Sequence, residues 1–146
     1  MSEVGAIVLP PASAERLWSD TSRWPTFIDG FKRVVEQDPR WPDVGSKVVW
    51  ESGPAGRGRV TERVTVSTPG RFATQVFEEQ LTGTQTLTFE VGDQDTLVTI
   101  ELDYELQKGG PFRAVTDVLF IRRALAEMLR RTLTRFATEA AEESSL

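Results

Sequence analysis

The 146-residue sequence contains no cysteine and no histidine, and it also lacks asparagine. These absences exclude disulfide bonds, thiolate and imidazole metal sites, cysteine nucleophiles, serine–histidine–aspartate triads and N-glycosylation. Any chemistry must come from carboxylates, arginine, lysine, the single tyrosine, hydroxyl groups or the backbone. We therefore expect neither a metal nor a cofactor.

Long hydrophobic runs are also missing. No window approaches the roughly 18 apolar residues of a membrane span, and the N-terminus lacks the basic start and apolar stretch of a secretory signal. We expect a cytoplasmic protein with no stable membrane insertion. A net charge of −5 gives no bulk electrostatic basis for binding nucleic acid. Length and composition fit a single domain over residues 1–146, as a monomer or homodimer.

The charges are unevenly distributed. Residues 72–107 hold eight carboxylates and no lysine or arginine, whereas residues 113–138 hold six arginines against two carboxylates. The sequence predicts an acidic solvated sheet face that includes Glu101, Asp103 and Glu105, with no calcium-loop pattern around them. It also predicts a basic solvated helix face, formed by Arg123, Arg130, Arg131 and Arg135.

The first thirty residues predict one strand and two short helices. The apolar run Val4–Leu9 is typical of a strand and is ended by Pro10 and Pro11. Ala12–Trp18 predicts a helix with Pro11 at its first position, where the missing N–H costs nothing. Trp24–Gly30 predicts a second, shorter helix, with a proline in its first turn and a closing glycine.

From Phe31 to Gln107 the pattern indicates β-structure, with strands rich in threonine and valine separated by proline and glycine pairs. Short connections favour an antiparallel meander. The six expected strands are Phe31–Gln37, Lys47–Ser52, Gly58–Ser67, Arg71–Glu79, Gly83–Val91 and Thr96–Leu106. Period-2 alternation in the last two strands predicts one buried and one solvated face.

After Gly109-Gly110-Pro111 the pattern becomes helical to about Glu142. At 100° per residue the apolar stripe comprises Val115, Val118, Leu125, Ala126, Leu129, Leu133, Phe136 and Ala140. Only the inner faces of the strands offer enough apolar surface to cover this stripe. The sequence therefore predicts an α+β fold in which a curved seven-stranded antiparallel sheet grips a long C-terminal helix.

Two local motifs carry a family resemblance. The segment Ala14-Glu15-Arg16-Leu17-Trp18-Ser19-Asp20 is followed by Trp24-Pro25 and Phe27, and Gly109-Gly110-Pro111-Phe112 precedes the arginine-rich helix. The order of elements resembles the helix-grip fold of the START-like (SRPBCC) superfamily, which includes plant pathogenesis-related allergens and lipid-transfer domains. The motifs resemble its polyketide cyclase/dehydrase family. This resemblance implies a cavity between sheet, long helix and short helices that holds an apolar or aromatic molecule.

Candidate cavity residues are the aromatic and polar side chains on predicted inner faces. They are Trp24, Phe27, Phe31, Trp50, Glu62, Phe72, Gln85, Phe89, Tyr104, Arg122, Leu125 and Leu129. For each aromatic ring, plain core packing is the alternative interpretation.

Four of these candidates are polar, and an unpaired polar group in a core is costly. In the functional interpretation, Glu62 transfers a proton and Arg122 clamps an oxyanion or carboxylate, while Tyr104 and Gln85 orient the ligand. In the structural interpretation, Glu62 and Arg122 pair with each other or face solvent. Tyr104 then anchors its hydroxyl to the backbone, and Gln85 bridges a strand irregularity beside Gly83.

Three functions remain open at this point. The leading hypothesis is binding of a small hydrophobic or aromatic ligand such as a lipid, polyketide or quinone. The alternative is a polyketide cyclase/dehydratase (aromatase) with Glu62, Arg122 and Tyr104 as catalytic candidates. A further alternative is a non-catalytic interaction module that uses the arginine-rich helix face.

Two observations disfavour the enzyme. Phe31 stands where the resemblance implies a tyrosine. The resemblance also implies an arginine directed into the cavity, for which Arg57, Arg59 and Arg63 are the candidates, but strand phasing places all three on the outer face unless a bulge shifts the register. The glycine-rich segment at residues 53–58 is predicted to be a hairpin loop rather than a nucleotide-binding loop, because it lacks the third glycine of a dinucleotide fingerprint and the lysine of a P-loop.

Overall fold

The computed structural model describes residues 1–146 apart from residues 54–55 and 108–114 and the side chains of residues 115 and 116. Its strands are β1 (Ser2–Ile7), β2 (Phe31–Gln37), β3 (Lys47–Ser52), β4 (Arg59–Thr68), β5 (Arg71–Phe77), β6 (Leu81–Val91) and β7 (Thr96–Leu106). Its helices are α1 (Pro11–Ser19), the 3₁₀ helix η1 (Thr21–Arg23), α2 (Trp24–Phe27) and α3 (Val115–Ser144).

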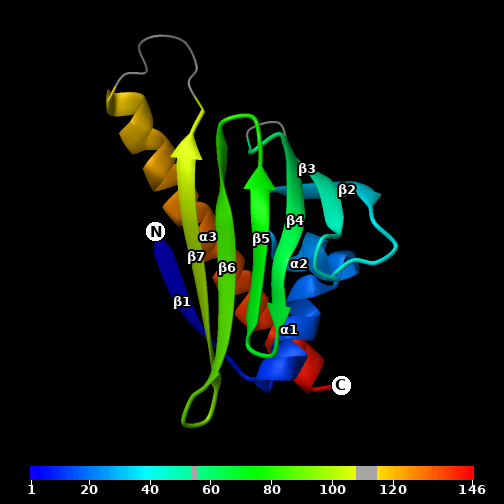
Figure 1. Ribbon diagram of the computed structural model, residues 1–146. Coiled ribbons are helices and arrows are strands. Elements are labelled where there is room, and N and C mark those ends of the chain that lie inside the picture. Colours follow the sequence, from blue (N-terminus) through cyan, green and yellow to red (C-terminus); the bar gives the residue numbers. More distant parts are fainter. Residues whose placement is uncertain (54–55, 108–114) are drawn as a thin grey trace.

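The strands form one antiparallel sheet in the order β1-β7-β6-β5-β4-β3-β2. Strands β2 to β7 are a continuous meander, and β1 closes the far edge by pairing with β7. Register shifts lie in the β2–β3 and β4–β5 pairs, and such bulges bend a sheet and increase its twist. Helix α3 runs diagonally across the inner face of this sheet (Figure 1). The predicted helix-grip architecture is confirmed.

The inner and outer faces of the sheet follow the alternation expected from the sequence. On β7, Val98, Ile100 and Leu102 are buried, whereas Glu101 and Asp103 are exposed. Glu105 is exposed as well. The acidic outer face predicted for this strand is therefore confirmed.

Several boundaries differ from the sequence prediction. β1 ends at Ile7 rather than Leu9, because Ile7 pairs with Thr96, the first residue of β7. α2 ends at Phe27 rather than Gly30, since the next residue, Ile28, is extended. β5 ends at Phe77, which releases Glu78 and Glu79 from the regular alternation.

The first turns of α3 differ from the predicted apolar stripe. Leu125, Leu129, Leu133, Phe136 and Ala140 are buried as expected, and Met128 and Thr132 are buried beside them. In contrast, Val118 is 38% exposed and Phe120 is 74% exposed. The first turns of α3 lie near the end of β7 (Figure 1), and their apolar side chains at these positions are not covered by the sheet. The prediction is right for the later part of the helix and wrong at Val118. Val115 lies outside the described side chains.

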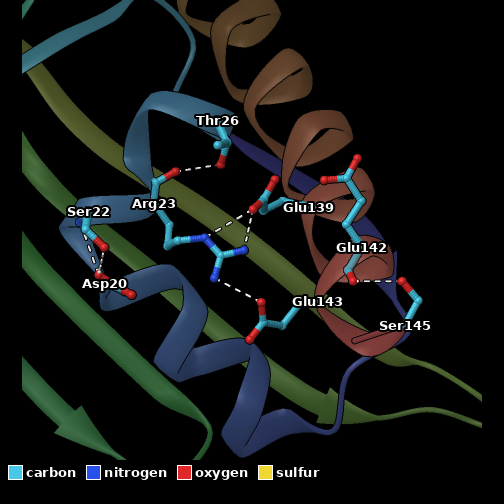
Figure 2. Close-up of polar contacts among 8 residues, drawn as sticks. All are labelled: Asp20, Ser22, Arg23, Thr26, Glu139, Glu142, Glu143 and Ser145. Atoms are coloured by element: carbon cyan, nitrogen blue, oxygen red, sulfur yellow. Dashed lines mark hydrogen bonds and ion pairs between the residues drawn. The ribbon is translucent and has the colours of Figure 1, made fainter.

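The C-terminal end of α3 is fastened to the short helices. Arg23 in η1 donates from Nη1 to Glu143 Oε2 at 2.9 Å and from Nε to Glu139 Oε1 at 3.1 Å. Its Nη2 also pairs with Glu139. Figure 2 shows the guanidinium pointing toward both carboxylates. The turn after α2 is fastened too, because the Asp29 N–H donates to Thr132 Oγ1 at 3.0 Å.

Among the described helices, none combines the length and the hydropathy that a membrane crossing requires.

Candidate functional site

A pocket of about 460 Å³ opens between one end of the sheet and the first half of α3. The β3–β4 and β5–β6 connections lie at the same end of the sheet as the start of α3 (Figure 1). This volume falls within the range of small-molecule sites. The lining residues are Asp29, Gly30, Gly56, Arg57, Glu78, Gln80, Leu81, Phe120, Ile121, Arg123, Ala124, Leu125, Glu127, Met128 and Arg131.

The wall of the pocket contains a buried ion pair. Arg57 Nε donates to Glu78 Oε2 at 2.5 Å, and Arg57 Nη2 lies 2.5 Å from the same oxygen. The two side chains are only 12% and 3% exposed. Despite its proximity to Glu78, Nη2 is buried and has no suitably directed hydrogen-bond acceptor among the described residues. One donor nitrogen of the pair is therefore left without a directed acceptor among the described residues.

The placement of Arg57 corrects the sequence prediction. Strand phasing put Arg57, Arg59 and Arg63 on the outer face, and only Arg59 and Arg63 are exposed there. Arg57 precedes the strand, which begins at Arg59, so the period-2 rule does not reach it. Gly58, between Arg57 and the strand, has a φ of +75°, a backbone conformation that glycine adopts readily.

The environment of Glu78 changes its acidity. Burial raises the pKa of the Glu78 carboxyl above its ordinary value, and the Arg57 guanidinium acts in the opposite direction. The charge of Glu62 raises the pKa of Glu78 further. The carboxylates of Glu78 and Glu62 and the guanidinium of Arg57 are therefore near one another, with Glu78 and Arg57 in the pocket wall and Glu62 buried behind it.

Glu62 is buried behind the pocket wall with both oxygens occupied. Trp50 Nε1 donates to Oε2 at 2.8 Å, and Thr74 Oγ1 donates to Oε1 at 2.9 Å. The Trp50 ring in turn lies 5.5 Å from Arg57 Cζ, within cation–π range. Glu62 thus holds Trp50, and Trp50 supports Arg57. Glu62 is not part of the pocket lining, and it is connected to Arg57 through Trp50.

Arg122 does not face the cavity. It is exposed on α3, so the expectation that it lies on the inward stripe is wrong, and so is its alternative pairing with Glu62. The helix places Ile121 and Leu125 toward the pocket instead. Tyr104 is half-buried on the inner face opposite Gly83, and Gln85 is buried two residues further along β6. Neither of them lines this pocket.

The predicted ligand-binding rings form a packed core. Trp24 contacts Phe31 and Trp50 edge to face, with ring centroids 6.2 Å apart in both pairs. Phe27 contacts Phe136 at 5.0 Å. The buried rings of Phe72 and Phe89 and the buried Leu129 belong to the same core. Of the predicted cavity residues, Leu125 is the one that lines this pocket, whereas the rings pack in or against the core.

The arginines of α3 are largely paired with acidic residues of this chain. Arg135 lies 3.1 Å from Asp29, Arg131 lies 3.5 Å from Asp29, and both Arg130 and Arg131 pair with Glu127. Arg123 at the pocket mouth has no ion pair with the described residues. An interaction module that uses this helix face stays a prediction.

Sequence reasoning missed Glu78, and it placed Arg57 on the outer face although the family resemblance implied an arginine in the cavity. The available signals were an arginine inside a glycine-rich loop and an acidic pair at the end of a strand. Neither signal indicates that Arg57 and Glu78 are in contact, because Arg57 lies between β3 and β4 and Glu78 lies between β5 and β6.

Comparisons with known proteins place the chain in a family. The family model described as polyketide cyclase / dehydrase and lipid transport matches residues 2–141. A search of curated proteins finds no significant match.

Three solved structures illustrate the shared fold. The Zhui aromatase/cyclase from Streptomyces sp. R1128 has a TM-score of 0.82 at 12% identity, over 99% of this chain and 94% of that one. A START superfamily protein from Mycobacterium smegmatis has a TM-score of 0.75 at 12% identity, over 97% of both chains. The di-domain ARO/CYC StfQ from the steffimycin biosynthetic pathway has a TM-score of 0.79 at 13% identity, over all of this chain and 51% of that one. At such identities the likeness concerns the fold.

The match along residues 2–141, together with the sheet that grips α3, shows that the chain belongs to the polyketide cyclase/dehydrase and lipid transport family and has its START-like fold.

Proposed function

We propose that this protein binds a small hydrophobic or aromatic molecule in the pocket between the sheet and the first half of α3, with one ligand oxygen on Arg57. The observation that carries the proposal is the pocket of about 460 Å³ lined by Arg57, whose buried Nη2 has no directed acceptor among the described residues. Apolar lining from Leu81, Leu125 and Met128 suits a hydrocarbon or ring body.

The packed aromatic core limits the size and position of the ligand. Because Trp18, Phe27 and Phe136 fill the space beneath the second half of α3, the ligand occupies the end of the sheet rather than its full length. The family description, which includes lipid transport, is consistent with a ligand-binding role.

A pocket-filling variant tests the proposal directly. Ala124 lines the pocket and is exposed, so Ala124→Trp adds an indole there without disturbing the core. Ala141→Trp, on an exposed position near the end of α3, is the matched control. A calorimetric titration with fatty acids, their methyl esters, polyphenols and quinones is expected to find at least one 1:1 ligand. Ala124→Trp should weaken its binding by about tenfold or more, and Ala141→Trp should not.

Two results would contradict the proposal: no member of the panel binds the wild-type protein, or Ala124→Trp binds as well as wild type. A second pair of variants locates the oxygen contact. Arg57→Met should weaken binding of the same ligand, whereas Arg59→Met, two residues away on the exposed face, should leave it unchanged.

A second candidate function is aldol-type cyclisation and dehydration of a poly-β-ketone. It is favoured by the guanidinium beside a carboxylate at the pocket wall, residues other than those predicted from the sequence. In this reaction the Glu78 carboxylate accepts a proton from a carbon between two carbonyls, and that carbon bonds to a carbonyl carbon polarised by Arg57. The resulting alkoxide takes that proton back from the Glu78 carboxyl, and loss of the new hydroxyl group together with the remaining α-hydrogen then releases one water and forms the carbon–carbon double bond. Shape and orientation in the pocket supply the remaining selectivity.

The enzymatic candidate has its own test. Supplied with a poly-β-ketone, the wild-type protein should shift the distribution of cyclised products away from the spontaneous mixture. Glu78→Gln should lower kcat more than it raises KM, and Glu79→Gln at the exposed neighbouring position should change neither. A wild-type product distribution equal to the spontaneous one would leave ligand binding as the function.

A further inference from the structure

The charge of Arg57 is already balanced inside the pocket wall. Its guanidinium contacts Glu78 at 2.5 Å, and both side chains are almost fully buried. A ligand carboxylate would have to share Arg57 with Glu78 or displace it. Either arrangement places two carboxylates side by side in a region poorly screened by water, which is unfavourable.

The carboxylate of Glu62 adds to the repulsion that a ligand carboxylate would meet at Glu78. Glu62 lies close enough to interact with the charge of Glu78, and it is held in place by Trp50 and Thr74. The inner part of the site therefore combines two carboxylates with one guanidinium. The other cations of the lining, Arg123 and Arg131, project from α3, and Arg131 pairs with Asp29 and Glu127.

The unused hydrogen-bonding capacity at this position belongs to a donor. Arg57 Nη2 is buried and lacks a directed acceptor among the described residues. A neutral carbonyl, quinone or ester oxygen satisfies such a donor without adding negative charge. An ammonium group has no lone pair to offer, and a carboxylate brings the repulsion described above.

We infer that Glu78 makes this pocket selective for ligands whose inner polar group is a neutral oxygen acceptor, and that it discriminates against the same ligands bearing a carboxylate there. The inference rests on the proposed ligand-binding function and names its ligand class. Glu78 is the specificity-determining residue, Arg57 supplies the hydrogen bond, and Glu62 positions Arg57 through Trp50.

Matched acid and ester probes test the selectivity. Anthraquinone-2-carboxylate and its methyl ester share one ring system, and palmitate and methyl palmitate share one chain. Both pairs are titrated into the wild-type protein at about pH 7.5, where ligand carboxylates are ionised. At least one ester should bind about tenfold or more tightly than its acid.

Two variants test whether Glu78 sets the ratio of ester affinity to acid affinity. Glu78→Gln keeps an oxygen beside Arg57 but removes the charge, so the ester-to-acid ratio should fall below about threefold, mainly because the acid binds more tightly. Glu79→Gln, at the exposed adjacent residue, should keep the wild-type ratio. Circular dichroism of each variant confirms folding, and the wild-type ratio is decisive even if Glu78→Gln fails to fold.

The outcomes separate the two claims. If acid and ester bind the wild-type protein equally, or the acid binds more tightly, the selectivity is overturned while ligand binding stands. If neither scaffold binds in either form and no other panel member does, the proposed function fails and the selectivity fails with it. If the ester preference persists in Glu78→Gln, another group sets it and the assignment to Glu78 is wrong.

Discussion

The two ends of the space between the sheet and α3 are built differently. Toward the C-terminal end of α3, Trp18, Phe27 and Phe136 pack ring against ring, and Arg23 fastens the helix to the short-helix segment. Toward its N-terminal end, Phe120 is 74% exposed and the pocket opens beside a buried ion pair. We call these the filled end and the pocket end.

Because the two ends are built differently, we expect the filled end to set the free energy of unfolding and the pocket end to set the affinity for the proposed ligand. At the filled end apolar surface is removed from water by close packing, which is the main source of folding free energy. At the pocket end the same helix leaves apolar side chains uncovered, so that a ligand can bury them. A substitution at one end should therefore affect unfolding, and one at the other end should affect ligand binding.

The largest expected effect is that of Phe136→Ala. This fully buried ring contacts Trp18 and Phe27, so its removal leaves a cavity and should lower the free energy of unfolding by about 3–5 kcal/mol. Phe120→Ala at the pocket end should change it by less than about 0.5 kcal/mol while weakening ligand binding. Urea denaturation measures both. Equal losses for the two variants would mean that the ends are not distinct.

The next largest effect is expected for Glu62→Ala. This change leaves Trp50 Nε1 and Thr74 Oγ1 buried without their acceptor, which should lower the free energy of unfolding by about 2–4 kcal/mol. Because Glu62 acts on the pocket through Trp50, ligand affinity should fall as well. Glu105→Ala, on the exposed outer face, is the control for both measurements. A stable variant with unchanged affinity would show that Glu62 does not support the pocket.

The pH dependence of stability tests Glu78 at the pocket end. Burial raises its pKa above the ordinary value of 4.5, so the folded state binds the proton more tightly than the unfolded state. The contribution of Glu78 is thus fully present below about pH 4.5 and is lost as pH rises through the folded pKa. Urea unfolding at a series of pH values should show this decline in wild type and not in Glu78→Gln.

A companion variant sharpens the pH test. Arg57 lowers the pKa of Glu78, so Arg57→Met should move the decline in stability to higher pH. An identical pH profile for wild type, Glu78→Gln and Arg57→Met would contradict the coupling between the two residues.

The smallest expected effect is that of the ion pair at the filled end. Arg23 is 29% exposed, and solvent screening reduces the value of such pairs. A double-mutant cycle with Arg23→Met and Glu139→Gln should give a coupling of about 1 kcal/mol or less, decreasing in high salt. A coupling larger than the effect of Phe136→Ala would mean that charge rather than packing holds this end together.

The sequence was a better guide to the filled end than to the pocket end. The bounds of β2, β3 and β7 match their predicted ranges, since dense alternation and turn residues mark them clearly. Leu129, Leu133 and Phe136 were correctly placed on the inward stripe. Several failures lie beyond regular elements or at their ends, where periodicity no longer reports which side chains face inward. Val118 and Arg122 lie inside α3, on the predicted inward stripe, but are exposed.

By itself, the sequence determined the order of elements, the two faces of the sheet and the exclusion of imidazole and thiol chemistry. These properties depend on local periodicity and on residue types. The tertiary structure alone decided that aromatic rings fill one end and that Arg57 meets Glu78 at the other. The Arg57–Glu78 contact joins residues 21 positions apart on two different connections, so it exists only once the meander has brought those connections to the same end of the sheet.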